Sequence, residues 1–292
     1  MNRVLYHILA ILTIVIWGTT FVSTKVLINS GLSPEEICLC RFIIAYICIW
    51  IFGPKRLFGN TIKDEIILAL LGVTGGTIYF WTENTALKFL PVADVTFLTS
   101  GTPIFMGIIM SIFFRDFKLT PKQWLYSVIA FIGVAIVIYS GAQGIHFSLI
   151  GDILCICASL SWCIYSVFVR KIGGKYPTLF MSRKIFFYGS LSLIPFFLME
   201  PFNATMDIFI QPKVWGNLIF LGVVASMVCF TTWNLSIKHL GTVITTNYMY
   251  INPVVSILSA IIILGESVSV LSVIGCFIIL GSVYLIQKNQ VN

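Results

Sequence analysis

The chain has 292 residues, of which 58% are hydrophobic and only 10% are charged, and its mean hydropathy is +0.99. Because water-soluble domains carry about 25% charged residues, this composition excludes a soluble fold, and it is far too apolar for a disordered chain. In a membrane chain, a net charge of +7 predicts the Lys and Arg excess of cytoplasmic loops, and no nucleic-acid partner is expected.

Charges, prolines and glycines divide the sequence into ten apolar runs, each of which predicts one membrane-spanning helix. The expected spans are, in chain order, residues 4–24, 37–52, 66–87, 92–114, 124–141, 150–169, 183–199, 214–236, 243–264 and 270–287. The first run lacks an Ala-x-Ala-like cleavage site, so we expect an uncleaved span. The predicted fold is an all-α integral membrane protein with ten transmembrane helices in contact with membrane lipids.

The basic residues divide unequally between the two ends of these spans. Of the 18 Lys and Arg residues, all but four fall on the side of the N-terminus; the four are Lys25, Arg41, Lys88 and Lys213. Since cytoplasmic loops carry the Lys and Arg excess, both termini are expected in the cytoplasm of a multi-pass cell-membrane protein.

The two halves of the sequence resemble each other. Residues 82–88 align with residues 232–238, which lie 150 positions later. Further matched pairs at this or a similar spacing are Gly72 and Gly222, Pro103 and Pro253, Asp116 and Glu266, Trp17 and Trp162, and Lys25 and Arg170.

This pattern predicts two repeats, residues 1–145 and 146–292. Five spans are an odd number, so the second repeat enters the membrane from the opposite side and is inverted. Inverted repeats are typical of carriers that alternate between two accessible states around a site near the membrane midplane. The matched Pro103 and Pro253 are expected to kink or break their helices, either as structural kinks or as part of the site.

The sequence resembles the EamA-type branch of the drug/metabolite transporter superfamily over nearly its whole length. The motifs that carry the resemblance are Trp17-Gly18-Thr19-Thr20-Phe21, Pro34 with Arg41-Phe42, residues 86–93, Thr102-Pro103, Asn252-Pro253, Gly265-Glu266-Ser267 and Gly275. The first half departs from the Gly-Glu pair and has Arg115-Asp116. The resemblance implies a ten-helix transporter, usually an exporter of amino acids or other small metabolites.

The clearest candidates for charge inside the membrane are three residues near the expected outer ends of their spans: Lys25, Arg41 and Glu83. Intramembrane charge is costly and often functional. The functional hypothesis is an outer gate in which Lys25 and Arg41 face Glu83 or a solute carboxylate; the alternative is anchoring at the membrane interface. Burial of Glu83 without a firm cationic partner would let it carry a coupling proton.

The repeat predicts inner counterparts for these residues. Arg170 corresponds to Lys25, and Lys184 is the nearest counterpart of Arg41. Trp233 replaces Glu83, so the two gates are expected to differ chemically.

Uncharged polar and aromatic residues are expected to line the solute pathway, or alternatively to join helices by hydrogen bonds. They are Trp17, Thr20, Tyr79, Asn84, Thr99, Trp162, Tyr165, Ser166, Asn234, Asn247, Tyr248, Tyr250 and Asn252. Such a site suits an amphipathic solute such as an amino acid, and basic gate residues would favour solutes with an anionic group.

The sequence therefore predicts a secondary active transporter, which the resemblance implies is an exporter, with a small-molecule solute and a proton or other ion as partners. A channel is disfavoured because an inverted repeat within one chain favours alternating access. A membrane-embedded enzyme is disfavoured because the three histidines lie near span ends and no Walker A pattern occurs. Neither a cofactor nor a metal is expected, and solute identity, transport direction and oligomeric state stay open.

Overall fold

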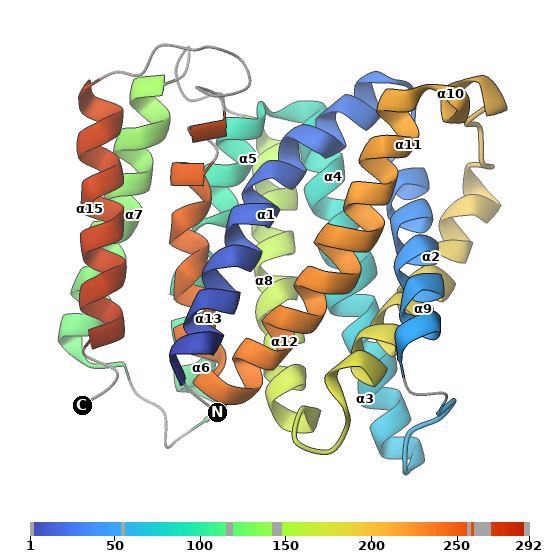
Figure 1. The fold of residues 1–292 in the computed structure, drawn as a ribbon. Helices are drawn as coiled ribbons and strands as arrows, with labels where there is room; N and C mark the ends of the chain where they lie inside the picture. The colour runs from blue at the N-terminus through green and yellow to red at the C-terminus, as the bar shows by residue number, and fades with distance from the viewer. Residues whose placement is uncertain are drawn as a thin grey trace.

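The computed structural model describes residues 3–53, 56–114, 119–141, 148–255, 258–259 and 270–288, and all regular structure within these ranges is helical. Five helical stretches are long and apolar enough to cross a membrane: Arg3–Asn29, Ile62–Phe89, Val92–Phe113, Leu149–Ile172 and Pro212–Leu240. This architecture confirms the predicted all-α membrane fold (Figure 1).

The first half contains α1 (Arg3–Asn29), α2 (Pro34–Phe52), α3 (Ile62–Gly72), the π-helical η1 (Val73–Ile78), α4 (Tyr79–Phe89), α5 (Val92–Thr99), α6 (Thr102–Phe113) and α7 (Pro121–Gly141). The second half contains α8 (Leu149–Ile172), α9 (Thr178–Met199), the short α10 (Met206–Ile210), α11 (Pro212–Ile219), the π-helical η2 (Phe220–Val228), α12 (Cys229–Leu240), α13 (Thr242–Thr246), the 3₁₀-helical η3 (Asn247–Ile251) and α15 (Val270–Lys288). Joined end to end and leaving α10 aside, the described elements form ten helical stretches, the ninth of which is described only in part.

Helix α2 begins at Pro34, three residues before the expected span. Ser33 and Glu36 form a capping box: the Glu36 N–H donates to Ser33 Oγ at 3.2 Å, and the Ser33 N–H donates to Glu36 Oε2 at 2.8 Å. Acidic side chains suit the first turn of a helix. The polar residues that precede the apolar run therefore belong to α2 as well. Arg41 therefore lies about two turns into α2 rather than near its end.

The two π-helical segments lie at matching positions of the two halves. A π turn holds an extra residue and offers its carbonyls to other partners. Ser161 Oγ donates to the Thr74 carbonyl of η1 at 2.8 Å, and Trp17 Nε1 donates to the Ala225 carbonyl of η2 at 2.9 Å. Each segment is thus bound by the opposite half of the chain.

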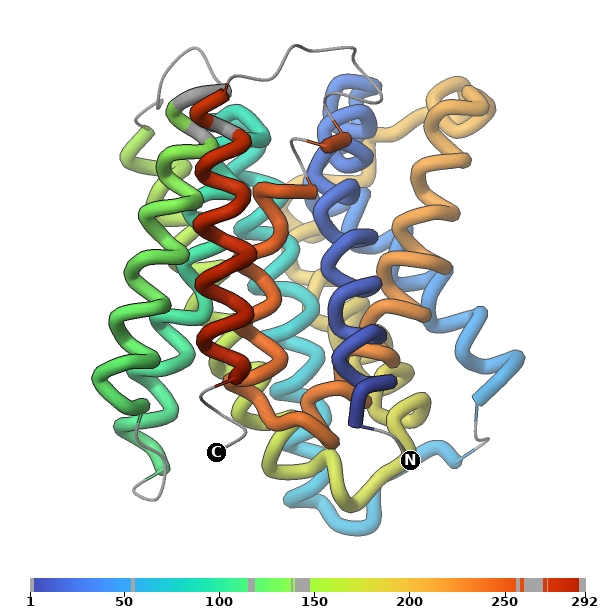
Figure 2. Tube along the Cα trace, turned by 60° about the vertical axis from the view of Figure 1, so that its left-hand side comes forward, coloured from blue at the N-terminus to red at the C-terminus, as the bar shows by residue number. Residues whose placement is uncertain are grey.

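Packing between the halves is reciprocal. Helix α1 packs on α12 while α8 packs on α4, and α2 packs on η2 while α9 packs on η1. Helices α2 and α9 contact each other, as do α7 and α15, which lie side by side at one edge in both views (Figure 2). Helix α1 begins and α15 ends at the same end of the bundle. This is the arrangement that two oppositely oriented five-helix repeats produce.

The helices around the two matched prolines are irregular. The chain between α5 and α6 is interrupted at Ser100 and Gly101, and Pro103 lies in the first turn of α6. In the second half, η3 precedes Pro253. The expected carboxylate positions Asp116 and Glu266 and the motif residues Arg115, Gly265 and Ser267 lie outside the described residues.

Candidate functional site

An aromatic cluster built from both halves occupies the centre of the molecule. The rings of Trp17 on α1 and Trp162 on α8 meet edge to face with centroids 5.3 Å apart. Trp233 lies 5.0 Å from Trp17, and Tyr79 lies 4.7 Å from Trp162. Phe230 contacts both Trp17 and Trp162. The two matched tryptophans thus meet at the interface of the repeats.

A small cavity of about 10 Å³ lies within this cluster. It is lined by Trp17, Thr20, Phe21, Tyr79, Phe80, Glu83, Trp162, Met249 and Asn252. A volume of this size holds about one water molecule. The central site must therefore widen before a larger molecule fits.

Among the described residues that line this cavity, Glu83 is the only charged one. Glu83 is 6% exposed, and the Tyr79 hydroxyl, one turn earlier on α4, donates to Oε1 at 2.6 Å. Glu83 forms no ion pair with Arg41 or any other described residue. A nearly buried carboxylate without an ion pair is an energetically expensive group that suggests a functional role.

Two further polar groups that line the cavity have no hydrogen-bond partner among the described residues. They are Trp162 Nε1 and Asn252 Oδ1, on side chains that are 1% and 3% exposed. Buried polar atoms are paired in the great majority of cases, so such unpaired groups are typical of a site that a ligand or water completes. The cavity therefore offers one donor and two acceptor groups from three different helical stretches.

Arg41 is buried and lies behind the cavity wall. Its guanidinium stacks over the Phe80 ring at 3.9 Å, and Nε donates to Ser226 Oγ at 3.0 Å. The side chain is 1% exposed, so the expectation that it anchors at the membrane interface is wrong. Arg41 thus contacts Phe80, which lines the cavity, but does not line the cavity itself.

Lys25 does not meet Glu83 in this state. Its Nζ donates to the carbonyl of Leu87 at 2.5 Å, near the C-terminal end of α4. A cation at this position satisfies a free helix carbonyl and complements the helix dipole. The outer gate expected from the sequence, with Lys25 facing Glu83, is therefore not formed in this structure.

The end of the bundle at which α3 begins carries two cation–carboxylate pairs between the halves. Lys184 on α9 pairs with Glu65 on α3, which also accepts a hydrogen bond from the Tyr188 hydroxyl. Lys175 in the α8–α9 loop pairs with Asp64 at 2.9 Å, and this neighbouring carboxylate raises the pKa of the Lys175 ammonium.

Arg170, the expected counterpart of Lys25, lies away from these pairs. It is exposed and stacks over Phe114 at 4.7 Å. Sequence reasoning missed Asp64 and Glu65, although both lie in the first turn of the helix that Thr61 caps.

The other predicted pathway residues divide into two groups. Thr20 and the residues already placed line the cavity, and the Thr20 hydroxyl donates to the Trp17 carbonyl at 2.7 Å. The remainder lie outside the cavity. The Tyr165 hydroxyl donates to Asn234 at 2.5 Å, the Asn84 amide to Cys38 Sγ at 3.3 Å and the Thr99 hydroxyl to the Val95 carbonyl at 2.8 Å. The Tyr248 hydroxyl contacts His7 at 2.6 Å, and three further side chains are buried: Ser166, Asn247 and Tyr250.

Three lining residues were not predicted: Phe21, Phe80 and Met249. The repeat contained a signal for one of them, because Phe80 pairs with Phe230 at the spacing of 150.

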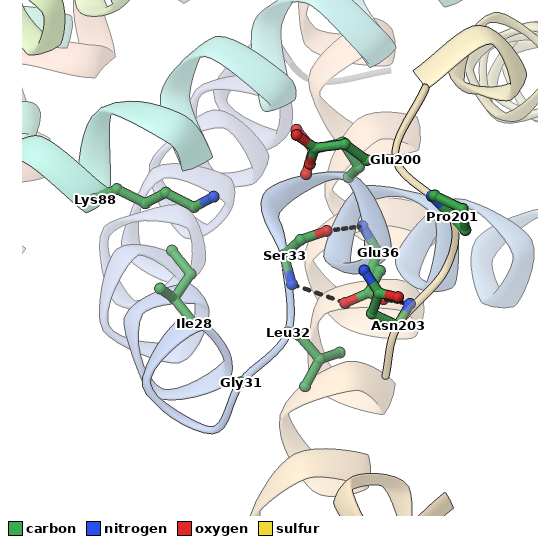
Figure 3. A pocket seen from close by; sticks show the side chains of 10 residues that line it. Ile28, Gly31, Leu32, Ser33, Glu36, Lys88, Glu200, Pro201 and Asn203 are labelled. Carbon is green, nitrogen blue, oxygen red and sulfur yellow. Dashed lines mark hydrogen bonds between the residues drawn. The ribbon is translucent and has the colours of Figure 1, made fainter. Parts of the chain in front are cut away.

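A second pocket, of about 300 Å³, opens at the end of the bundle where α1 ends (Figure 3). Lys88 and Glu200 reach toward it from opposite sides. Glu36 Oε1 accepts hydrogen bonds from the N–H groups of Asn203 and Ala204, at 2.7 and 2.8 Å, which fastens the α9–α10 connection to α2. The end of the bundle at which α1 ends is thus more open than the centre.

Comparison with known proteins places the chain in a family. The EamA-like transporter family matches twice, over residues 4–139 and 149–287. A probable amino-acid metabolite efflux pump of Salmonella typhimurium is 25% identical, with 95% of this chain and 93% of the relative covered. A probable terminal-alkyne amino-acid exporter of Streptantibioticus cattleyicolor is 22% identical, with 95% and 92% covered.

An uncharacterized transporter of Archaeoglobus fulgidus is 24% identical over 97% of this chain and 98% of its own length. A crystal structure with 18% sequence identity superposes with a TM-score of 0.77 over 99% of this chain and 98% of that one, which shows the same fold. Because the family matches both halves and together covers most of the sequence, the chain belongs to the EamA-like transporter family.

Proposed function

We propose that the protein is a secondary active transporter that exports small amphipathic metabolites, amino acids among them, by alternating access. The observation that carries this proposal is the small central cavity, which Trp17 and Trp162 line from matched positions of the two repeats. Inverted repeats around a shared central site allow the site to open to either side in turn. The relatives named as amino-acid efflux pumps and exporters favour the amino-acid class.

In this proposal the two units, residues 1–145 and 146–292, tip against each other about the aromatic cluster. Both termini face the cytoplasm, in accord with the excess of Lys and Arg on that side. The Lys184–Glu65 pair then closes the cytoplasmic side of the site. Opening toward the cytoplasm separates α9 from α3 and breaks this pair.

We further propose that Glu83 binds the coupling proton. Within the described part of the chain, its carboxylate is the only charged group in the cavity wall, is nearly buried and has no ion pair, while the Tyr79 hydroxyl fixes its orientation. Arg41 is a nearby cation that stacks on Phe80 and does not line the cavity, whereas Glu83 does.

The test is transport by the purified full-length protein in proteoliposomes, with a panel of labelled amino acids and other small metabolites. We expect saturable uptake and acceleration of labelled efflux by unlabelled solute on the opposite side. A Tyr139→Phe variant, altered on the exposed surface of α7, serves as the control with unchanged transport. Flux that rises without saturation and shows no counterflow would support a channel and contradict the proposal.

A further inference from the structure

We infer that the central cavity recognises its solute through a positively charged amino group, held by Glu83 and Asn252, and does not require a carboxylate on the solute. This inference rests on the proposed function and names the chemical class that the transport site takes. It departs from the sequence-based hypothesis that basic gate residues favour anionic solutes.

The first step of the argument is the placement of the cations. Lys25 is bound to the Leu87 carbonyl, and Lys184 is paired with Glu65. Arg170 is exposed, and Arg41 lies behind Phe80. None of these four side chains lines the cavity, so among the described residues no cation in the cavity wall is placed to receive a solute carboxylate.

The second step is the pair of acceptors. Glu83 contributes a carboxylate whose Oε1 is already fixed by Tyr79, and Asn252 contributes an unpartnered Oδ1. Both side chains line the same small cavity, one from α4 and the other from the helical stretch that contains Pro253. An ammonium group donates three hydrogen bonds and carries the charge that complements Glu83.

The third step is the aromatic wall. Tyr79, Phe80, Trp17 and Trp162 all line the cavity. Aromatic faces attract cations, and the attraction grows when the cation is removed from water. A largely buried site with one carboxylate and several aromatic rings therefore favours an amine over a carboxylic acid.

The remaining polar group completes the pattern. Trp162 Nε1 is a neutral donor without a partner among the described residues, so it suits an oxygen acceptor near the amine. A carboxylate, an ester carbonyl or a hydroxyl oxygen each accepts such a bond. We therefore expect an amino acid, its methyl ester and the corresponding amino alcohol to bind with similar affinity.

The experiment uses two series of probes on the purified full-length protein: leucine and phenylalanine, their methyl esters, their amino alcohols and the matching acids that lack the amino group. Binding is followed by intrinsic tryptophan fluorescence, because three tryptophans meet at the site. We expect the amine-bearing members of a series to agree within about threefold and the acid without the amine to bind at least tenfold more weakly, a factor equal to about 1.4 kcal/mol.

Variants separate recognition from folding. Glu83→Gln and Asn252→Leu should each reduce amine binding at least tenfold and remove most of the preference over the amine-free acid. Asn84→Ala is the matched control: Asn84 follows Glu83 directly, yet its amide contacts Cys38 outside the cavity, so the preference should persist.

The outcomes distinguish this inference from the proposed function. Amine-free acids that bind and undergo counterflow as well as the amino acids would overturn the inference and leave the carrier proposal standing. Retention of the full amine preference in Glu83→Gln would also overturn it. Absence of binding and counterflow by every compound in both series would overturn the amino-acid carrier proposal as well.

Discussion

Trp17 and Trp162 occupy matched positions in the two repeats and meet edge to face, but only Trp17 has its indole N–H bonded, to the Ala225 carbonyl at 2.9 Å. Trp162 Nε1 has no partner among the described residues. The same substitution at these two positions therefore removes a structural hydrogen bond in one case and a free donor in the other.

We predict that Trp17→Phe is less stable than Trp162→Phe by about 1 kcal/mol, the net value of one buried hydrogen bond. Both variants lose the same ring volume, so the difference between them reports the bond to η2. Solute affinity should fall more in Trp162→Phe than its stability explains. Equilibrium unfolding in detergent and solute titration provide the two measurements; equal destabilisation with equal loss of affinity would contradict the assignment.

The ion pair between Glu65 and Lys184 offers a second prediction. Lys184→Met should shift the population toward states that are open at the end of the bundle where α3 begins, because it removes the ion pair between α9 and α3 and leaves Glu65 only the neutral Tyr188 hydroxyl as a partner on α9. The measurement is the labelling rate of Ser182→Cys, a fully buried position, by a membrane-impermeant thiol reagent in a background without the native cysteines.

Lys175→Met is the matched control for this experiment. Its ammonium is largely solvent-exposed, and exposed ion pairs contribute little because water and salt screen them. We therefore expect labelling close to that of the parent chain. Equal labelling in Lys184→Met and Lys175→Met would argue that the ion pair between Lys184 and Glu65 does not hold this end of the site closed.

The π-helical segment η1 packs against α8 through a glycine that has no room for a side chain. A methyl group on Gly75 would overlap the ring of Tyr165, whereas one on Gly76 would meet Gly189 Cα at an acceptable 3.4 Å. We predict that Gly75→Ala costs about 1–3 kcal/mol of stability through overpacking and disturbs the Tyr165–Asn234 bond. Gly76→Ala should be close to neutral. Thermal unfolding of both variants measures this, and equal stability would contradict the packing of Tyr165 on η1.

Glu83→Gln tests the proton hypothesis. Glutamine still accepts a hydrogen bond from Tyr79, but it does not gain or lose a proton. With solute at saturating concentration, we expect counterflow to persist while the response of uptake to an imposed pH gradient disappears. Uptake by Glu83→Gln vesicles that keeps its full dependence on the pH gradient would exclude Glu83 as the proton carrier.

The helical membrane fold and the repeat were accessible from the sequence because both leave local signals. Apolar runs bounded by charges indicate the spans, and matched residues such as Asn84 and Asn234, which occur at a constant spacing, indicate the repeat. The same spacing brings the π-helical segments into register, although nothing in the residue pattern predicted a π turn.

Side-chain depth was harder to predict. The apolar run suggested that α2 starts at residue 37, which placed Arg41 near a membrane surface, whereas the Ser33–Glu36 capping box extends the helix outward and leaves the guanidinium buried. Likewise, the partner of Lys184 is Glu65, from a different helix of the other half, and such long-range pairing leaves no trace in a single sequence.

The position that matches Glu83 in the second repeat holds Trp233. Two copies of one scaffold thus share a centre in which one copy supplies the acid and the other only a ring. If transport depends on that single carboxylate, each chain moves one solute per cycle. The two end states, open to one side of the membrane or to the other, then differ in energy even when the two solutions are identical.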